Sequence, residues 1–262
     1  MNYKRTWNKK FGKSEIYTKE NAACRMVEID MVRLRDGERK SYDIPDHEFA
    51  LVILGGKCDV RGDGFAFDGI GERADVFGGP ATCLYIPRNR AFTITGAGEV
   101  SLCVCRAPAV RDHEVKLIRP EDAVIKNMGK PGWQRQASFI LDERTDADIL
   151  YIGECYVAGG QWASYPPHKH DDDNMPVEAA TEEIYYYEFK EPSGFGIQRV
   201  YTKEGDVDEV YVVHSGDFVV IASGAHPFLT APGYDNYYLW IMAGPHRGFY
   251  MTTDEDHIAL TK

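Results

Sequence analysis

The chain has 262 residues, a length that suits two domains of ordinary size or one large one. Hydrophobic residues make up 44% of it, enough for a buried core, and a formal net charge of −11 disfavours a nucleic-acid partner, because phosphate binding needs a basic face. The basic first residues are not followed by the apolar stretch of a signal peptide, and no run approaches the length of a membrane span, so we expect a cytoplasmic protein without a membrane partner.

Short β-rich runs dominate the first half of the chain. Sixteen Tyr and twelve Phe residues, with many Val and Ile, favour strands, and no long stretch has helical periodicity. Clusters of Gly, Pro, Asp and Asn separate the runs, which is typical of an all-β sandwich or barrel. Six cysteines without a C-x-x-C spacing fit buried, reduced thiols. We expect strands over residues 25–34, 49–54, 57–60, 83–86, 91–95 and 100–106.

A polar stretch divides the chain near its middle. Residues 119–136 (RPEDAVIKNMGKPGWQRQ) are rich in turn-forming residues, so we expect the chain to cross between two domains here, with one short helix over 120–125. We place the division between residues 125 and 126. The second half predicts strands over residues 148–157, 163–170, 183–190, 195–202, 209–213, 217–221 and 236–243.

The two halves resemble weak copies of each other. Residues 79–89 and 216–226 both run from a glycine through an apolar strand to a turn, but only the second segment ends in a histidine, His226. The first half contains only His47 and His113 and has no H-x-H sequence. We interpret the halves as duplicates of which one kept a metal site and the other lost it. The alternative is that any two β-domains share such patterns.

His168 and His170 form an H-x-H pair in the second half. The preceding residues, Pro166 and Pro167, block a helix, and on an extended strand residues i and i+2 point the same way. Both imidazoles therefore reach one face, close enough to share an ion. An H-x-H by itself is weak evidence, because most histidines are structural or exposed, and the residues that follow strengthen it.

A glutamate and a third histidine follow this pair in the order that a metal site needs. A strand, a hairpin, a strand and then a glycine turn carrying His226 is the layout of a cupin barrel. Glu182 and Glu183 both offer a carboxylate, but only one of them can face the histidines, because alternation along a strand puts them on opposite faces. Glu178 is a more distant choice. The acidic run 171–173 is expected to be a solvated loop. Mixed nitrogen and oxygen ligands suit Zn, Mn, Fe, Co or Ni.

The stretch from Ser164 to Pro245 closely resembles the bacterial 5-deoxy-glucuronate isomerases of inositol degradation. The resemblance rests on SYPPHKHDDDNMP, EEIYYYEF, PSGFGIQRVYT and GAHPFLTAPGYDNYYLWIMAGP, with looser agreement in the first half through GERADVF, LYIPRNRAFTITG and ASFIL. It implies an all-β, two-domain cupin (bicupin) built from two double-stranded β-helix, or jelly-roll, barrels. The expected barrels are residues 1–125 without a metal site and residues 126–262 with one.

The resemblance also implies an activity. The expected enzyme is a metal-dependent aldose–ketose isomerase that converts 5-deoxy-D-glucuronate, a small sugar acid, to 5-dehydro-2-deoxy-D-gluconate in myo-inositol catabolism. We expect His168, His170, Glu183 and His226 to bind a divalent metal ion, with zinc preferred over Mn, Fe, Co or Ni. We also expect a homo-oligomer.

Two details of the resemblance bear on the metal ligands. In the related 4-deoxy-uronate ketol-isomerases a glutamate directly precedes an aliphatic-aromatic run, which favours Glu183, next to Ile184 and Tyr185, over Glu182. Ala222 stands where the family usually has a proline before the turn to His226. This departure loosens a turn without removing a ligand.

Side chains for the rest of the substrate are less strongly indicated. An acidic protein needs local positive charge to bind a carboxylate, and a hairpin centred on Pro192 would put Arg199 on the face of Glu183, whereas a one-residue slip would turn Gln198 inward. Further cations to consider are Lys169, expected to point outward, Arg247 and Arg90. We expect Glu183, besides binding the metal, to take part in catalysis together with Tyr185 and Tyr238, which can donate hydrogen bonds or act as general acids. Ordinary barrel packing is the alternative role for these tyrosines, as it is for Tyr187.

Three other functions remain open on sequence alone. They are a ketol-isomerase for a pectin-derived deoxy-uronate, a non-catalytic cupin that binds a sugar, and a cupin dioxygenase. The first differs in its preferred sugar, the second binds sugar without exchanging its hydrogens, and the third consumes oxygen.

Overall fold

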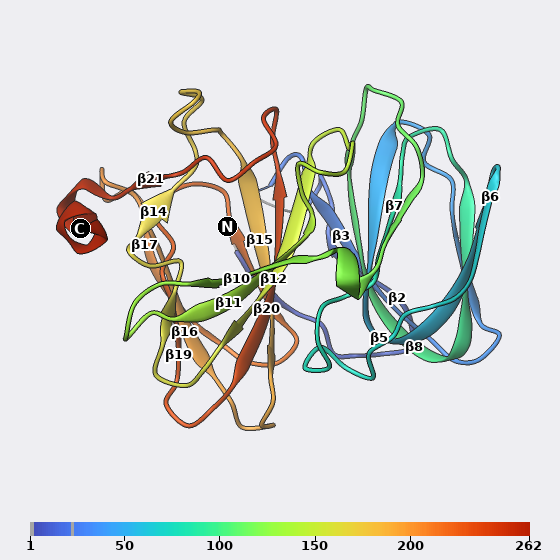
Figure 1. Cartoon of the computed structure of the whole chain (residues 1–262), viewed down its shortest axis with the longest axis horizontal. Coiled ribbons are helices and arrows are strands. Elements are labelled where there is room, and N and C mark those ends of the chain that lie inside the picture. The colour runs from blue at the N-terminus through green and yellow to red at the C-terminus, as the bar shows by residue number, and fades with distance from the viewer. Residues whose placement is uncertain (1–2, 22–23) are drawn as a thin grey trace.

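Strands build two barrels that lie side by side in the computed structural model, which describes residues 3–21 and 24–262 (Figure 1). Helical structure within these residues is confined to two 3-10 segments, η1 (Pro120–Asp122) and η2 (Glu255–Thr261). Neither these segments nor any other described helix has the length and apolar character of a membrane span.

The first barrel is built on one eight-stranded sheet. Its strands are β2 (Gly12–Tyr17), β3 (Glu28–Leu34), β4 (Arg39–Tyr42), β5 (His47–Gly62), β6 (Phe65–Ile70), β7 (Cys83–Ile86), β8 (Phe92–Pro108) and β9 (Lys116–Ile118). The order is β2-β3-β8-β5-β7-β9, with β4 added to β8 and β6 added to β5. The predicted strands 49–54 and 57–60 join into β5, as 91–95 and 100–106 join into β8.

A bulge explains why one strand looked like two. The pairing of β5 with β8 shifts around Gly55 and Gly56, so the strand bends without ending. Gly56 has a φ of +85°, and a Cβ atom there would lie 2.0 Å from the carbonyl oxygen of Glu99. Only glycine fits such a position. In the sequence, the Gly55-Gly56 pair resembles a turn between two strands, which is why β5 was predicted as two.

The second barrel places a seven-stranded sheet opposite a four-stranded one. The seven-stranded sheet runs in the order β1 (Lys4–Thr6), β18 (Asp217–Ile221), β15 (Glu182–Phe189), β20 (Asn236–Ala243), β12 (Leu150–Val157), β11 (Arg135–Leu141) and β10 (Val124–Met128). The four-stranded sheet contains β13 (Trp162–Ala163), β19 (Phe228–Thr230), β16 (Gly196–Tyr201) and β17 (Asp208–Val213), and a separate pair joins β14 (His168–Lys169) to β21 (Thr252–Thr253). Apolar side chains from both large sheets meet in one core inside the barrel.

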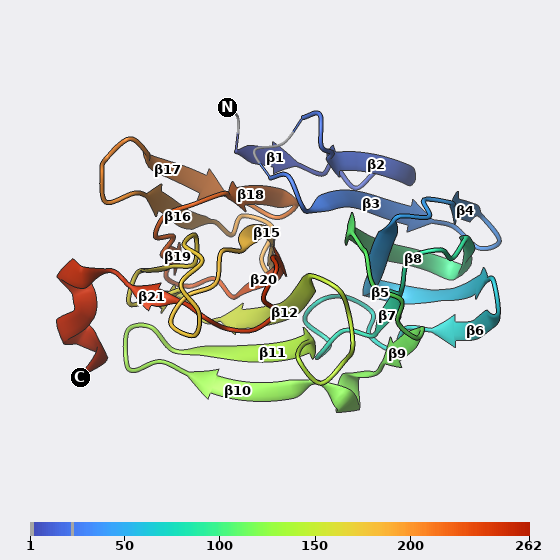
Figure 2. The ribbon, with the colours of Figure 1, turned by 90° about the horizontal axis from the view of Figure 1, so that it is seen from above.

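The two ends of the first half belong to the second barrel. β1 pairs with β18, with Lys4 opposite Val219, and in Figure 2 it lies at the edge of that sheet. The division predicted between residues 125 and 126 cuts through β10, which pairs with β11 in the second barrel. The sequence boundary between barrels therefore lies before Val124, and the predicted crossing 119–136 is mostly a hairpin. The expected helix over 120–125 is the single turn η1.

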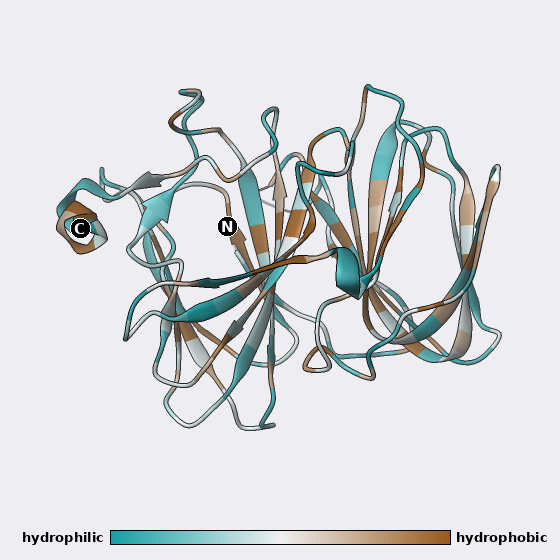
Figure 3. Cartoon of the chain, viewed as in Figure 1, coloured by the Kyte–Doolittle hydropathy of each residue, from teal (hydrophilic) through white to brown (hydrophobic). Residues whose placement is uncertain are grey.

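A shared apolar core joins the barrels. β15 supplies it with Ile184 and Tyr186 from one face, while Tyr185 and Tyr187 on the other face enter the interior of the second barrel. Figure 3 shows hydrophobic segments, in brown, on the central strands where the two barrels meet. β15 is thus covered on both sides, and its odd-numbered residues, Glu183 among them, face inward.

Candidate metal centre

His168 and His170 enter the interior of the second barrel together. The two side chains are buried, and both line the same pocket as Glu183. Lys169 points the other way, and its amine lies 2.6–2.8 Å from carboxylate oxygens of Asp171, Asp172 and Glu178. The alternation expected of an extended H-x-H is present, although regular strand structure covers only His168 and Lys169.

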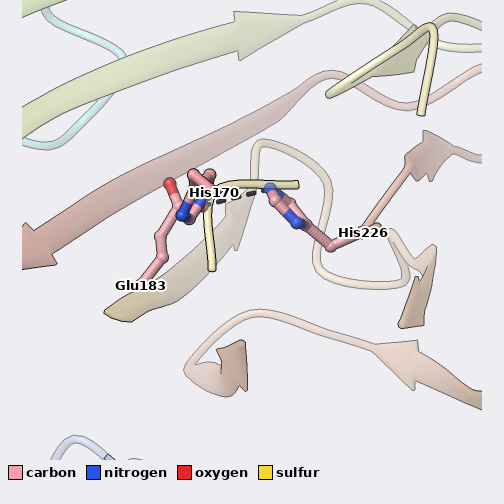
Figure 4. Close-up of side chains that lie close together, drawn as sticks. All are labelled: His170, Glu183 and His226. Carbon is pink, nitrogen blue, oxygen red and sulfur yellow. Dashed lines mark hydrogen bonds and ion pairs between the residues drawn. The ribbon is translucent and has the colours of Figure 1, made fainter. Parts of the chain in front are cut away.

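Glu183 and His226 complete a compact cluster with His170. Ligand atoms of these three buried residues all lie within 4.8 Å of one another. Glu183 Oε2 is 3.1 Å from His170 Nε2 and 3.2 Å from His226 Nε2, and Figure 4 shows the three side chains converging. The ring of His168 lies beside this cluster, with its centroid 4.9 Å from that of His226.

The choice between the two glutamates follows from the faces of β15. Glu182 points away from the cluster and accepts hydrogen bonds from the backbone N–H groups of Arg25 and Met26 at 2.7–2.8 Å. Glu183, its neighbour, faces the imidazoles. Glu178 is occupied by Lys169, so among the three glutamates weighed from the sequence only Glu183 joins the histidines.

Backbone carbonyls orient all three rings. Nδ1 lies 3.3 Å from the Pro166 oxygen in His168, 3.0 Å from the Thr181 oxygen in His170, and 3.0 Å from the Gly224 oxygen in His226. Because a carbonyl oxygen can only accept, each Nδ1 carries the proton, and in His170 and His226 Nε2 is the atom that lies next to Glu183. This arrangement is the usual support for metal-binding histidines.

One nitrogen of the cluster lacks a hydrogen-bond partner. His226 Nε2 is fully buried, and its 3.2 Å contact with Glu183 does not have hydrogen-bond geometry. A buried imidazole nitrogen beside a carboxylate oxygen and further imidazoles matches the donors of a divalent metal ion. The residues present therefore fit such an ion.

Protonation within the cluster is set by its single carboxylate. Burial raises the pKa of Glu183, but the rings of His170 and His226 lower it to about 2. Burial lowers the pKa of His170, but its hydrogen bond to Glu183 leaves that pKa above its ordinary value. Burial and the neighbouring imidazoles hold the pKa of His168 well below its usual range. Glu183 thus stays ionised and His168 stays neutral, as metal ligands must.

Two tyrosines line the pocket beside the cluster. The hydroxyl of Tyr185 lies 2.8 Å from Ser164 Oγ, and the rings of Tyr185 and Tyr238 are 4.9 Å apart. Burial raises the pKa of both phenols well above the ordinary value, so both are neutral donors at physiological pH. The lining side chains, among them Phe249 and Met251 just before β21, leave about 20 Å³ of free space, so a sugar acid needs some of them to move.

Arg135 also lines this pocket, and the sequence analysis missed it. It is the first residue of β11 and lies near Tyr238, Cys155 and Tyr185. We had placed it in the crossing between domains. The alternation of Arg135, Ala137 and Phe139, all of which line the pocket, is the signal that would have found it.

The prediction that Arg199 faces Glu183 is wrong. It assumed a hairpin between the strands at 183–190 and 195–202, but β15 pairs with β18 and β20, whereas β16 pairs with β17 and β19 in the opposite sheet. The connection between β15 and β16 crosses the barrel. Arg199 lies on the outer face, where it forms an ion pair with Asp208 at 2.8 Å.

Gln198 points inward but is occupied by the protein. Its amide nitrogen donates to the carbonyl oxygens of His226 at 2.7 Å and Pro227 at 3.2 Å, and its oxygen accepts from Tyr187 at 2.6 Å. These contacts position the backbone of His226 and leave no free group for a substrate.

The remaining cations named from the sequence lie outside the pocket. Arg247 donates to three backbone carbonyls of the second barrel, those of Leu150, Thr145 and Asp142, at 2.7–2.8 Å. Arg90 is exposed in the first barrel and contacts the Asp63 carbonyl.

The chain is similar to known proteins over almost its whole length. The model of the KduI/IolB family matches residues 6–260. The chain is 36% identical to the 5-deoxy-glucuronate isomerase of Geobacillus thermodenitrificans (strain NG80-2) over 92% of its own length and 88% of that protein. It is also 36% identical to the enzyme of the same name from Bacillus subtilis (strain 168), over 92% of the chain and 89% of the relative.

Solved structures establish the fold class. An IolB-like protein from Salmonella typhimurium LT2 superposes with a TM-score of 0.95 and 34% identity, over 100% of both chains. The oxalate decarboxylase of Lactobacillus farciminis superposes with a TM-score of 0.69 at 11% identity, over 100% of this chain and 91% of that one, a likeness of fold alone. The predicted all-β, two-domain cupin architecture is confirmed.

Proposed function

Because the chain belongs to the KduI/IolB family, we propose that it is a metal-dependent aldose–ketose isomerase that converts 5-deoxy-D-glucuronate to 5-dehydro-2-deoxy-D-gluconate in inositol catabolism. The observation that carries the proposal is the buried cluster of His170, Glu183 and His226 at the base of a pocket in the second barrel. A non-catalytic sugar-binding protein has no need of such donors beside two neutral phenols.

The ligand set of the proposal is His168, His170, Glu183 and His226. Zinc is our choice of ion, and Mn, Fe, Co and Ni suit the same donors. When bound, such an ion supplies Lewis acidity to the carbonyl and the neighbouring hydroxyl of a sugar. A pKa of about 2 makes Glu183 a weak proton acceptor, so we assign it to holding the ion rather than to taking a proton.

Tyr185 and Tyr238 are the groups of this chain that we propose to donate hydrogen bonds to the substrate oxygens. Isomerisation moves a hydrogen between adjacent carbons, and charge develops on the oxygens attached to them. A neutral phenol can donate to such an oxygen and stabilise it in a site closed to water. A hydrogen bond of 2.8 Å to Ser164 Oγ holds the hydroxyl oxygen of Tyr185, so the position of this phenol is set before substrate arrives.

The proposal is tested with purified protein and two sugars. We expect NMR to show conversion of 5-deoxy-glucuronate to the ketose, with exchange of hydrogens at the reacting carbons. Faster turnover of the pectin-derived 4-deoxy-uronate would assign the rival ketol-isomerase activity. Binding of either sugar without turnover by metal-loaded protein would contradict an enzyme.

The role of the metal is tested in the same preparation. Elemental analysis should find about one divalent ion per chain, and chelation followed by re-addition of single metals should abolish and restore turnover. Oxygen uptake during turnover would instead indicate a dioxygenase.

A further inference from the structure

Buried arginines in this protein have partners that account for their charge. Arg73 lies 2.7 Å from Glu154 between the barrels, and Arg106 contacts Asp30 at 2.7 Å and Glu28 at 3.0 Å. Arg247 instead satisfies three backbone carbonyls. This is the general rule, because a buried charge without a partner costs several kcal/mol, on the order of the whole stability of a domain.

Arg135 departs from this rule. Within residues 3–21 and 24–262 no carboxylate lies within ion-pair distance of its guanidinium, and the polar groups that interact with it include the uncharged side chains of Tyr238, Cys155 and Tyr185 and the ring of His168. The side chain is half-buried and lines the wall of the metal pocket. The chain has a net charge of −11, so carboxylates are abundant, yet none of the described ones forms an ion pair with Arg135.

The surroundings of Arg135 suit an anion of a ligand. Its fork of N–H donors matches a carboxylate in a bidentate geometry, and the phenols of Tyr185 and Tyr238 can add hydrogen bonds. His168, His170 and Glu183 line the same pocket, so one small molecule can contact the metal cluster and the guanidinium together once lining side chains move to admit it. The two ends of a six-carbon sugar acid carry the two groups that these sites would bind.

We propose that Arg135 is the specificity-determining residue of this pocket and binds the carboxylate of the sugar acid while the opposite, reacting end lies at the histidine–glutamate cluster. The inference rests on the proposed function for the identity of the acid. It assigns to Arg135 the role for which the exposed Arg199 is unsuited, since Arg199 is neutralised by Asp208 on the outer face of β16.

The test compares an acid with its uncharged counterpart. We would measure kcat/KM for 5-deoxy-glucuronate and for 5-deoxy-glucose, in which a primary alcohol replaces the carboxylate, using wild type, Arg135→Gln and Arg135→Lys. Arg135→Gln should lower kcat/KM for the acid roughly ten- to hundredfold, the effect of losing a charge-assisted pair, while kcat/KM for the neutral sugar stays within about twofold. Arg135→Lys should recover part of the loss.

Arg199→Gln is the matched control. It removes an arginine from the opposite sheet of the same barrel and should leave both substrates unaffected, because this side chain lies outside the pocket. Metal content by elemental analysis should be equal in all variants. Equal losses for the acid and the neutral sugar after Arg135→Gln would show a structural role and overturn the inference.

The inference can fail separately from the proposed function. If wild type turns over neither sugar, the proposed function fails, and calorimetric titration with 5-deoxy-glucuronate still tests Arg135. Binding by wild type that Arg135→Gln weakens at least tenfold would support the inference. Equal binding by both proteins, or binding by neither, would overturn it.

Discussion

The hydroxyl of Thr181 is predicted to strengthen metal binding through His170. Thr181 Oγ1 lies 2.8 Å from His170 Nδ1, and the Thr181 carbonyl oxygen lies 3.0 Å from the same nitrogen. Thr181→Val removes the first contact, keeps the second and preserves the shape of a buried side chain. The ring loses one of two groups that hold it toward the cluster.

The magnitude follows from what remains after the substitution. Removing a group that supports a metal-binding histidine typically costs ten- to hundredfold in affinity. Since the carbonyl still fixes the ring of His170, we expect the lower end, about tenfold, or about 1.4 kcal/mol. The assay is competition for Zn²⁺ between metal-free protein and a chromophoric chelator of known affinity.

Thr230→Val is the matched control for Thr181→Val. Thr230 is also fully buried in the second barrel, but its hydroxyl has no hydrogen-bond partner among the described residues. The control should leave zinc affinity unchanged. Unaltered affinity in Thr181→Val, or an equal loss in both variants, would refute the reasoning.

Three further outcomes are expected. Chelating the metal should lower the melting temperature by about 5–10 °C, because an ion at about a hundredfold its Kd stabilises the fold by about 2.7 kcal/mol; calorimetry before and after EDTA checks this, and no shift would argue against a bound ion. Glu154→Leu leaves the guanidinium of Arg73 buried without its carboxylate and should lower the free energy of unfolding, measured in urea, by about 3–5 kcal/mol. The double variant Glu154→Leu with Arg73→Met should recover much of this loss. A double variant no more stable than the single one would contradict the pairing. Burial raises the pKa of Glu178, but Lys169 and backbone N–H groups lower it to about 2, below the value near 4.5 of the unfolded chain. The ionised carboxylate therefore contributes its full stabilisation above about pH 4.5 and loses it as the pH falls toward 2. The difference in unfolding free energy between wild type and Glu178→Gln should shrink from pH 6 to pH 3, and a constant difference would speak against this role.

Features that depend on local alternation were predictable from the sequence. The common direction of His168 and His170 needs only the geometry of an extended segment, and the opposite directions of Glu182 and Glu183 follow from the same rule. Which glutamate faces the histidines needed the family resemblance, because alternation alone does not say which face is inside. The structure agrees on both points.

Features that depend on distant pairing were not predictable. The residues between β15 and β16 have the composition of a hairpin turn, yet they connect opposite sheets, and nothing local distinguishes these outcomes. That choice decides whether Arg199 or Gln198 points inward. The inward position of Arg135 was not predicted for the converse reason: the glycines and proline of the β10–β11 turn resemble a linker, although the two strands pair as a hairpin.

The pairing of β1 with β18 has a consequence for the order of events during synthesis. Thr6 on β1 bonds to Asp217, 211 residues further along the chain, so β1 is synthesised well before the strand with which it pairs. Contacts of such long range form late in folding, and until then the edge of β18 is unpaired and open to other strands. The first barrel can collapse early, but the nascent protein stays vulnerable to misassembly until β1 pairs with β18 and closes the second barrel.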